Sequence, residues 1–193
     1  MSVSPFSRTA LFVALLAAVL AAGCSKQVRY GDPQAVETVS LDFGSTDLQT
    51  IAEAMTRSML QAPVIANGNQ PIVTVQEVRN KTSEYIDTRA ITDSIRSQLS
   101  RSGRVRFAVD EAAMQQQIGE LQRQQSEYYE RSQAAEIGRM VGAAYRLEGN
   151  LVSIVKSNKK TKDVYYKFNL QLWNIQNGLL EWSDEKEIRK TES

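Results

Sequence analysis

Residues 164–182 carry the sequence VYYKFNLQLWNIQNGLLEW, in which hydrophobic and polar side chains alternate. This period of two residues is typical of a β-strand with one buried face. The Asn177-Gly178 dipeptide favours a hairpin, because both central residues of a tight two-residue turn adopt a positive φ. We therefore predict two antiparallel strands, at 164–175 and 180–190. The residues predicted to share the core face are Val164, Tyr166, Phe168, Leu170 and Leu172.

A two-residue turn also determines which side chains lie opposite each other. It places Ile175 opposite Leu180 and Trp173 opposite Trp182, on the face away from the core. Such a tryptophan pair has two interpretations. Either a helix, the N-terminal segment or a bulge covers it, or it is an exposed aromatic patch of the kind that binds a protein partner.

The segments before this hairpin predict alternating helices and strands. A helical spacing of apolar residues follows Thr46 and Asp47, either of which is a candidate N-cap, and another follows Asp87. Pro63 ends the first helix and Gly103 the second. The other predicted elements are strands at 36–43, 71–78, 105–109 and 145–155, a turn at 80–84, a helix from 110 and a helix at 132–141. The sequence predicts an α/β (α+β) fold, a single domain whose mixed, mainly antiparallel sheet is flanked by about four helices.

The N-terminus has the pattern of a bacterial lipoprotein signal. Arg8 is the only charged residue before the apolar run at 10–22, which Gly23 and Cys24 follow. The run is shorter than the about 20 apolar residues of a transmembrane helix, and small residues precede signal cleavage sites. We expect acyl chains such as palmitate on Cys24. The alternative, ordinary cleavage nearby, leaves Cys24 as a free thiol.

This interpretation divides the chain into three parts. They are a signal peptide at 1–23, a short tether at 24–35 and a globular domain at 36–193. By resemblance to sorted lipoproteins, Ser25 directly after the cysteine implies the periplasmic face of the outer membrane.

The composition excludes several classes of function. The 193 residues include no histidine and one cysteine, and the formal net charge is +1. Without histidine, the chain forms neither a Ser-His-Asp nor a Cys-His nucleophile system, nor a histidine-ligated metal site. A nucleic-acid-binding domain has a strong basic excess. We expect no enzymatic activity, no metal or small-molecule cofactor and no nucleic-acid partner, although a carboxylate-pair hydrolase stays formally open.

One predicted turn, between the strands at 145–155 and 164–175, is rich in lysine. It contains Lys156, Lys159, Lys160 and Lys162. Such a run is typical of a solvated hairpin tip. The alternative is that it steers an acidic partner, or the anionic inner face of an envelope layer, toward this end of the sheet.

Several segments, taken together and in order, resemble the LpoB family of lipoproteins that activate a penicillin-binding protein. They are VRNKTSEYIDT at 78–88, ITD at 91–93, SGRVRF at 102–107, EIGR at 136–139, GAAY at 142–145, GNL at 149–151 and GLLEWSDEKEIRK at 178–190. The GAAY segment by itself is also similar to CsgG-like lipoproteins and to the TolB N-terminal domain.

The resemblance implies a regulator of peptidoglycan synthesis and cell-wall biogenesis. Members of the family are non-enzymatic outer-membrane lipoproteins that reach through the peptidoglycan to a class A penicillin-binding protein. They dock on its non-catalytic domain and stimulate its glycosyltransferase and transpeptidase activities. One departure concerns the tether. The best-known members have a long proline-rich tether, whereas about 12 residues separate Cys24 from the first predicted strand here, a reach of at most ~35 Å.

The expected docking surface is the outer face of the hairpin, with Trp173, Trp182, Ile175 and Leu180. A second candidate is the segment at 80–87, whose Tyr85 we expect to be exposed. We expect a monomer. Two other functions stay open, a structural lipoprotein of an envelope export or assembly complex with a CsgG- or TolB-N-like scaffold, and a wall hydrolase.

Overall fold

The structure is a computed structural model, and it describes residues 30–36 and 40–193. Chain contacts divide the protein into two units, Met1–Pro33 and Gln34–Ser193. The described hydrophobic core lies in the second unit, and a unit with its own core is able to fold by itself. The predicted signal peptide and Cys24 lie outside the described residues.

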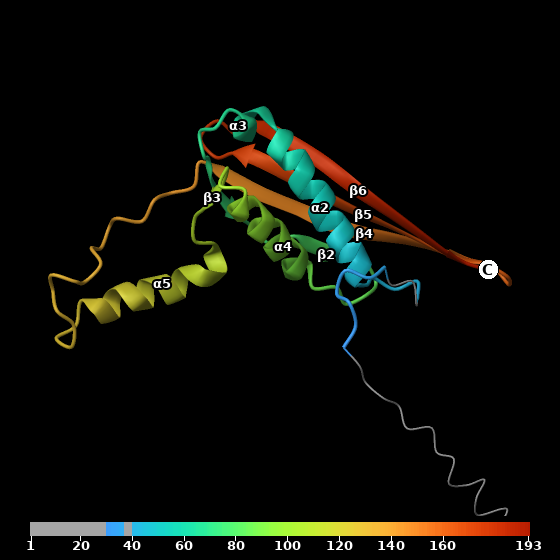
Figure 1. The fold of residues 1–193 in the computed structure, drawn as a ribbon, viewed down its shortest axis with the longest axis horizontal. Helices are drawn as coiled ribbons and strands as arrows, with labels where there is room; N and C mark the ends of the chain where they lie inside the picture. Colours follow the sequence, from blue (N-terminus) through green and yellow to red (C-terminus); the bar gives the residue numbers. More distant parts are fainter. Residues whose placement is uncertain (1–29, 37–39) are drawn as a thin grey trace, which may run out of the picture. The chain divides into compact units, whose positions relative to one another are not determined.

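The second unit is built on a six-stranded mixed sheet with the strand order β3-β1-β4-β5-β6, in which β2 also pairs with β4 (Figure 1). The strands are β1 (Ile72–Val75), β2 (Arg79–Lys81), β3 (Arg106–Phe107), β4 (Tyr145–Ser157), β5 (Lys162–Asn174) and β6 (Leu180–Glu192). The long strands β4, β5 and β6 are antiparallel, while β1 and β2 run parallel to β4, and β3 parallel to β1. The predicted α+β class with a mixed sheet is confirmed, although β1 and β3 are shorter than predicted.

The helices are α2 (Ser45–Gln61), α3 (Pro63–Ala66), α4 (Thr88–Arg101) and α5 (Glu111–Gln124). Of these, α2 and α4 cover one face of the sheet (Figure 1). The helical spacing in α4 buries Ile91, Ile95 and Leu99, and α2 buries Ile51 and Met55 in the same core. Opposite them, the predicted core face of β5 is confirmed, because all five predicted side chains are at most 3% exposed.

The predicted helix boundaries are partly confirmed. Asp87 caps α4 by accepting a hydrogen bond from the Arg89 N–H at 3.0 Å, and Gly103 after it has a φ of +67°, which glycine adopts without strain. The N-cap of α2 is Gly44 rather than Thr46 or Asp47. The Asp47 carboxylate reaches back to the Gly44 N–H at 2.8 Å, so Asp47 supports the helix start from inside the first turn.

The predicted strand at 36–43 is wrong for its described part, since residues 40–43 form no strand; residues 37–39 lie outside the described residues. Side chains of the domain hold this segment instead of a strand partner. The Phe43 N–H donates to Glu84 Oε2 at 3.0 Å, and Lys190 Nζ donates to the Asp42 carbonyl at 2.6 Å.

The predicted helix at 132–141 is also wrong. Residues 125–144 form turns and bends, with Gly138 at a φ of +84°, and a left-handed residue interrupts a helix. Ile137, Met140 and Val141, the apolar residues of the expected helix, are all exposed. They have no core face to cover, so tertiary packing does not stabilise a helix here. Instead Gln124 Oε1 accepts from the Ala135 N–H at 2.9 Å and holds the segment against the end of α5.

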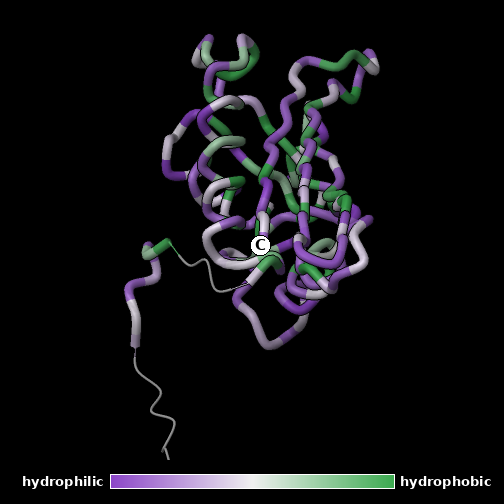
Figure 2. Tube along the Cα trace, turned by 90° about the vertical axis from the view of Figure 1, so that its right-hand side faces the viewer, coloured by the Kyte–Doolittle hydropathy of each residue, from purple (hydrophilic) through white to green (hydrophobic). Residues whose placement is uncertain are grey.

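Hydrophobic and hydrophilic residues alternate at short intervals along the described chain (Figure 2). None of the helices in residues 30–36 and 40–193 is both long and apolar enough to cross a membrane.

Replacing Gly149 by alanine should lower the free energy of unfolding by about 1–3 kcal/mol. A Cβ on Gly149 in β4 would collide with the backbone carbonyl of Asn169 in β5, and a backbone atom yields only if the strands move apart. Urea unfolding measures the loss. Gly119→Ala is the control, because a Cβ there meets no atom within 4 Å; equal costs at both sites would contradict a role for the close approach.

Asp110, the N-cap of α5, should make stability depend on pH. Burial raises the pKa of its carboxyl, but the Ala113 N–H and the Arg96 and Arg89 guanidinium groups lower the pKa by more, so the net shift is downward. A depressed folded pKa gives stability that is present above the unfolded pKa of about 3.9 and lost as pH falls through the folded value.

We therefore expect Asp110→Ala to cost about 1–2 kcal/mol near neutral pH. The difference from the unsubstituted protein should shrink in acid, as the Asp110 carboxyl of the unsubstituted protein takes up its proton. Urea unfolding at about pH 7 and about pH 3 checks this. A difference that stays constant would assign the cost to packing rather than to the ionised carboxylate.

Candidate docking surface

The loop after β2, residues 82–87, is closed by side chains of its own neighbourhood. Asn80 Nδ2 donates to the Glu84 carbonyl at 2.8 Å, and Asn80 Oδ1 accepts from the Thr82 N–H at 2.9 Å. The Glu84 N–H donates to the Thr82 hydroxyl at 3.2 Å. Side-chain turns of this kind specify one loop conformation. The turn predicted at 80–84 starts later than expected, because Arg79–Lys81 pairs with β4 as β2.

Tyr85 is 98% exposed at the centre of this loop. Both of its neighbours in the chain are anchored, since Ile86 is buried and Glu84 binds the Tyr166 hydroxyl and the Phe43 N–H. At the end of the loop, the Thr88 hydroxyl donates to the Val78 carbonyl at 2.6 Å. An aromatic ring on a rigid loop loses little conformational entropy when a partner covers it.

Beneath the loop lies a cluster of polar side chains from distant parts of the chain. Tyr166 in β5 donates to Glu84, and the Phe43 ring meets its ring edge-on at 5.6 Å between centroids. Burial, the hydrogen bond to Glu84 and nearby carboxylates together raise the pKa of Tyr166 strongly. The hydroxyl thus stays protonated near neutral pH and keeps donating to Glu84.

An ion pair joins the same cluster. Lys190 Nζ at the end of β6 donates to the Asp47 carboxylate, whose residue is 4% exposed. The Lys190 ammonium also lies 5.9 Å from the centroid of the Tyr166 ring. This cluster therefore holds four parts of the chain together: the start of α2, the residues before it, the Tyr85 loop and β6.

The predicted tryptophan pair is wrong. Strand pairing places Trp182 opposite Leu172 and Trp173 opposite Leu180, with a bulge at this position. Glu181 is the extra residue of β6, and one extra residue turns the following side chains to the other face. Trp182 consequently packs against the core, and its Nε1 donates to Ser58 Oγ of α2 at 3.2 Å.

The predicted partner-binding residues therefore separate. Trp173 stays on the uncovered face, half-buried, and its Nε1 is buried without a hydrogen-bond partner. Ile175 and Leu180 are 50% and 45% exposed near the hairpin loop, where Leu179, which the sequence did not single out, is 60% exposed. The Ile175 N–H binds the Ala144 carbonyl at 3.0 Å, beside the start of β4.

Tyr85 belongs to a different surface from the hairpin loop. Lys81, four residues before Tyr85, pairs with Val152, which is seven residues along β4 from Tyr145 and so about 23 Å from the hairpin-loop end of the strand. Cys24, the predicted lipidation site, lies outside the described residues.

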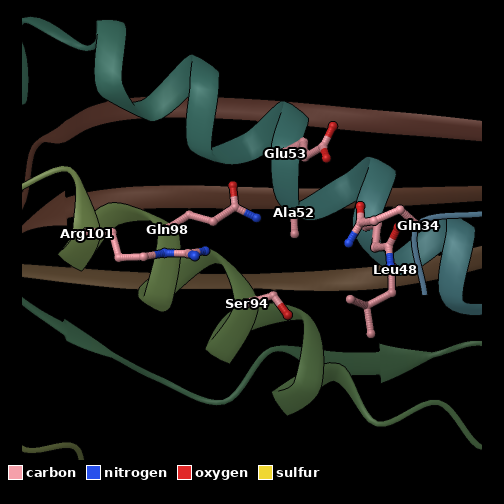
Figure 3. Close-up of a pocket in the computed structure, with 8 residues that line it drawn as sticks. Gln34, Leu48, Ala52, Glu53, Ser94, Gln98 and Arg101 are labelled. Atoms are coloured by element: carbon pink, nitrogen blue, oxygen red, sulfur yellow. The ribbon is translucent and has the colours of Figure 1, made fainter. Parts of the chain in front are cut away.

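A shallow hollow of about 340 Å³ lies between α2 and α4 (Figure 3). Among its described lining residues, Glu53 is the one carboxylate and Arg101 the one cation, which provides neither a nucleophile with its base nor a set of metal ligands. In residues 30–36 and 40–193, no three His, Cys, Asp or Glu side chains lie close enough together to hold a metal ion.

Comparison with known proteins identifies the family to which this chain is similar. The family model described as the peptidoglycan-synthase activator LpoB matches residues 47–188. The LpoB C-terminal domains from Salmonella enterica and from Escherichia coli are each 23% identical, with 74% of this chain and 98% of theirs covered, at a TM-score of 0.46. The lipoprotein GNA1162 from Neisseria meningitidis is 14% identical, with coverages of 63% and 83% and a TM-score of 0.42. No protein with a curated description matches.

The matched segment contains the Tyr85 loop, the strands β4 and β5 and nearly all of the core. The resemblance drawn from the sequence segments is thus confirmed: the chain belongs to the LpoB family of peptidoglycan-synthase activators.

Proposed function

We propose that this protein is a non-enzymatic activator that docks on the non-catalytic domain of a class A penicillin-binding protein through the Tyr85 loop. The observation that supports this surface is the combination of full exposure at Tyr85 with anchoring of both its neighbours. A large aromatic side chain held in place before binding has the properties of an interface hot spot.

Activation by docking requires that the lipoprotein bind the active synthase conformation more tightly than the inactive one. Coupling free energies between two sites are typically about 1–3 kcal/mol, which correspond to roughly 5- to 150-fold effects. Docking alone can therefore stimulate both glycosyltransfer and transpeptidation without any catalytic group on this chain.

The proposed place of action is the periplasm, with the protein held on the inner face of the outer membrane by acyl chains on Cys24. Each buried methylene adds about 0.8 kcal/mol, so several chains make an essentially permanent anchor. The tether predicted at 24–35 limits the reach of the domain. Activation would then depend on how closely the synthase approaches through the peptidoglycan.

The hairpin loop is the second candidate surface for the same partner. Its exposed residues, Ile175, Leu179 and Leu180, are aliphatic, whereas aromatic residues and arginine dominate hot spots. The Tyr85 loop therefore ranks first. Trp182 leaves the candidate surface because it binds Ser58 of α2.

The experiment is glycan polymerisation from lipid II by each class A penicillin-binding protein of the host, with and without residues 25–193. That fragment contains the complete unit Gln34–Ser193. We expect acceleration of one synthase and no turnover by the fragment alone. If no synthase responds, the protein is instead a scaffold of an envelope complex, and if the fragment alone degrades peptidoglycan, it is a wall hydrolase.

A further inference from the structure

The turn between β4 and β5 lies at the end of the sheet opposite the β5–β6 hairpin loop. It carries positive charges that are not part of the proposed docking surface. This lysine tip, residues 156–162, contains four exposed lysines: Lys156, Lys159, Lys160 and Lys162. Strands β4, β5 and β6 extend beyond the ends of α2 and α4 here, toward the C-terminus (Figure 1). The lysine tip therefore belongs to the part of the sheet that extends beyond these helices (Figure 1).

The charges of the lysine tip are not neutralised within the domain. Among the described residues, no carboxylate lies within 4 Å of any of the four ammonium groups, since none of them takes part in an ion pair. The nearest acid in sequence, Asp163, is already bound by Arg189 at 2.7 Å and by the Thr191 hydroxyl at 2.9 Å. In the strand pairing, Glu192 stands opposite Lys162 and Asp163 opposite Lys156. Together with Arg189, five cations therefore face two carboxylates here, which leaves a net charge of +3.

The turn itself holds the lysines in one arrangement. Asn158 Oδ1 accepts from the Lys160 N–H at 2.8 Å and from the Thr161 N–H at 2.9 Å, and the Asn158 N–H donates to the Thr161 carbonyl at 2.9 Å. A side-chain-capped turn of this kind has a defined backbone. The four lysines therefore lie within seven consecutive residues around a turn of defined backbone.

Apolar side chains flank the lysine tip on both faces of the sheet. Ile154, on the uncovered face, is 54% exposed, and Val155, on the helix-covered face, is 47% exposed because the helices end before it. A hollow of about 660 Å³ on the Ile154 side is lined by Ile154, Lys156 and Tyr165, together with the ion-paired Asp163 and Arg189, Ile188 and the carboxylate of Glu187. Exposed aliphatic groups next to lysines match the boundary between lipid headgroups and acyl chains.

We infer that the lysine tip is a docking site for an anionic lipid surface. Residues 156–162 contain neither arginine nor an aromatic residue, and these are the types enriched at protein interfaces, whereas lysine is depleted there. Lysine is a compact point charge that suits diffuse attraction to many phosphate groups. Near an anionic membrane each lysine strengthens binding by roughly fivefold. This contact would orient the domain with its β4–β5 end on a bilayer, independently of the acyl anchor and of the Tyr85 loop.

The test uses residues 25–193, which lack the acyl chains, in co-sedimentation with vesicles of phosphatidylglycerol and phosphatidylethanolamine. Neutral phosphatidylcholine vesicles are the comparison. We expect binding to the anionic vesicles alone, with a large loss between about 50 mM and about 300 mM salt. The variant with all four lysines changed to glutamine should bind roughly 600-fold more weakly, or not at all.

A charge-matched control separates the lysine tip from net charge. It changes four exposed arginines elsewhere on the domain to glutamine: Arg57, Arg104, Arg106 and Arg131. It should keep vesicle binding, and both variants should unfold at the same urea concentration as the unsubstituted fragment. Equal losses in the two variants would overturn the inference in favour of overall charge. Absence of vesicle binding, with weaker synthase binding by the lysine variant, would assign the lysine tip to an acidic protein instead.

Discussion

Replacing Lys190 by alanine should lower the free energy of unfolding by about 3–5 kcal/mol. Lys190 is the cation of a largely enclosed pair, with side-chain exposures of 18% for Lys190 and 6% for Asp47. Its removal leaves the Asp47 carboxylate buried without its cation, and the desolvation cost of that charge is then uncompensated. The Asp42 carbonyl loses its hydrogen-bond partner at the same time.

The matched control for this substitution is Lys186→Ala. Lys186 lies on the same strand and faces the same side of the sheet, and no ion pair to it is recorded among the described residues. Its removal should cost about 0.5 kcal/mol or less. Urea unfolding at neutral pH measures both variants. If Lys190→Ala lowers the free energy of unfolding no more than Lys186→Ala does, then water solvates the Asp47 carboxylate and reaches the cluster under the Tyr85 loop.

Sequence reasoning predicted the elements whose signals are local and repeated. α4 was predicted within one residue at each end, because apolar spacing, the Asp87 cap and Gly103 all indicate the same helix. Strands β4 and β5 were predicted from long alternating runs. In these segments the periodicity of the sequence and the packing on the core agree, so tertiary structure changes nothing.

The hairpin register was not predictable from the dipeptide signal. The loop between β5 and β6 spans residues 175–179, and the Asn174 N–H bonds the Leu179 carbonyl at 2.9 Å. Gly178 alone takes a positive φ, at +72°, while Asn177 does not. The bulge at Glu181 then reverses the side chains that follow. A single extra residue therefore moved Trp182 from the expected outer face onto α2, although both strands were correctly predicted.

The candidate site was predictable only in part. Tyr85 was named as the aromatic residue of the second candidate surface, the segment at 80–87, but its anchoring depends on contacts between distant parts of the chain. Tyr166 and Glu84 are 82 residues apart, and Lys190 and Asp47 are 143 residues apart. No local pattern indicates such pairs, because the periodicity within one segment does not say which distant segment it will contact.

Replacing Tyr85 by alanine should weaken binding to the synthase by roughly 30-fold or more and remove most of the activation. A hot-spot aromatic residue contributes at least about 2 kcal/mol to binding, and each 1.4 kcal/mol is a tenfold change in affinity. Stability should change by no more than about 0.5 kcal/mol, because the side chain is 98% exposed and no hydrogen bond of it is recorded. The affinity is measured by surface plasmon resonance on the immobilised synthase, and the activation by the rate of glycan polymerisation.

Tyr128→Ala is the matched control for this prediction. Tyr128 is 86% exposed, in the segment 125–144 that follows α5, so the substitution removes the same apolar area and hydroxyl from another surface. It should leave affinity and activation unchanged. Glu84→Gln adds a test of preorganisation. It keeps Tyr85 but weakens the contact with Tyr166, so a flexible loop would pay the ordering cost on binding, and affinity should fall by several-fold. If Tyr85→Ala activates the synthase fully, and a Leu179→Ala and Leu180→Ala double variant loses affinity and activation, then the docking surface is the hairpin loop instead.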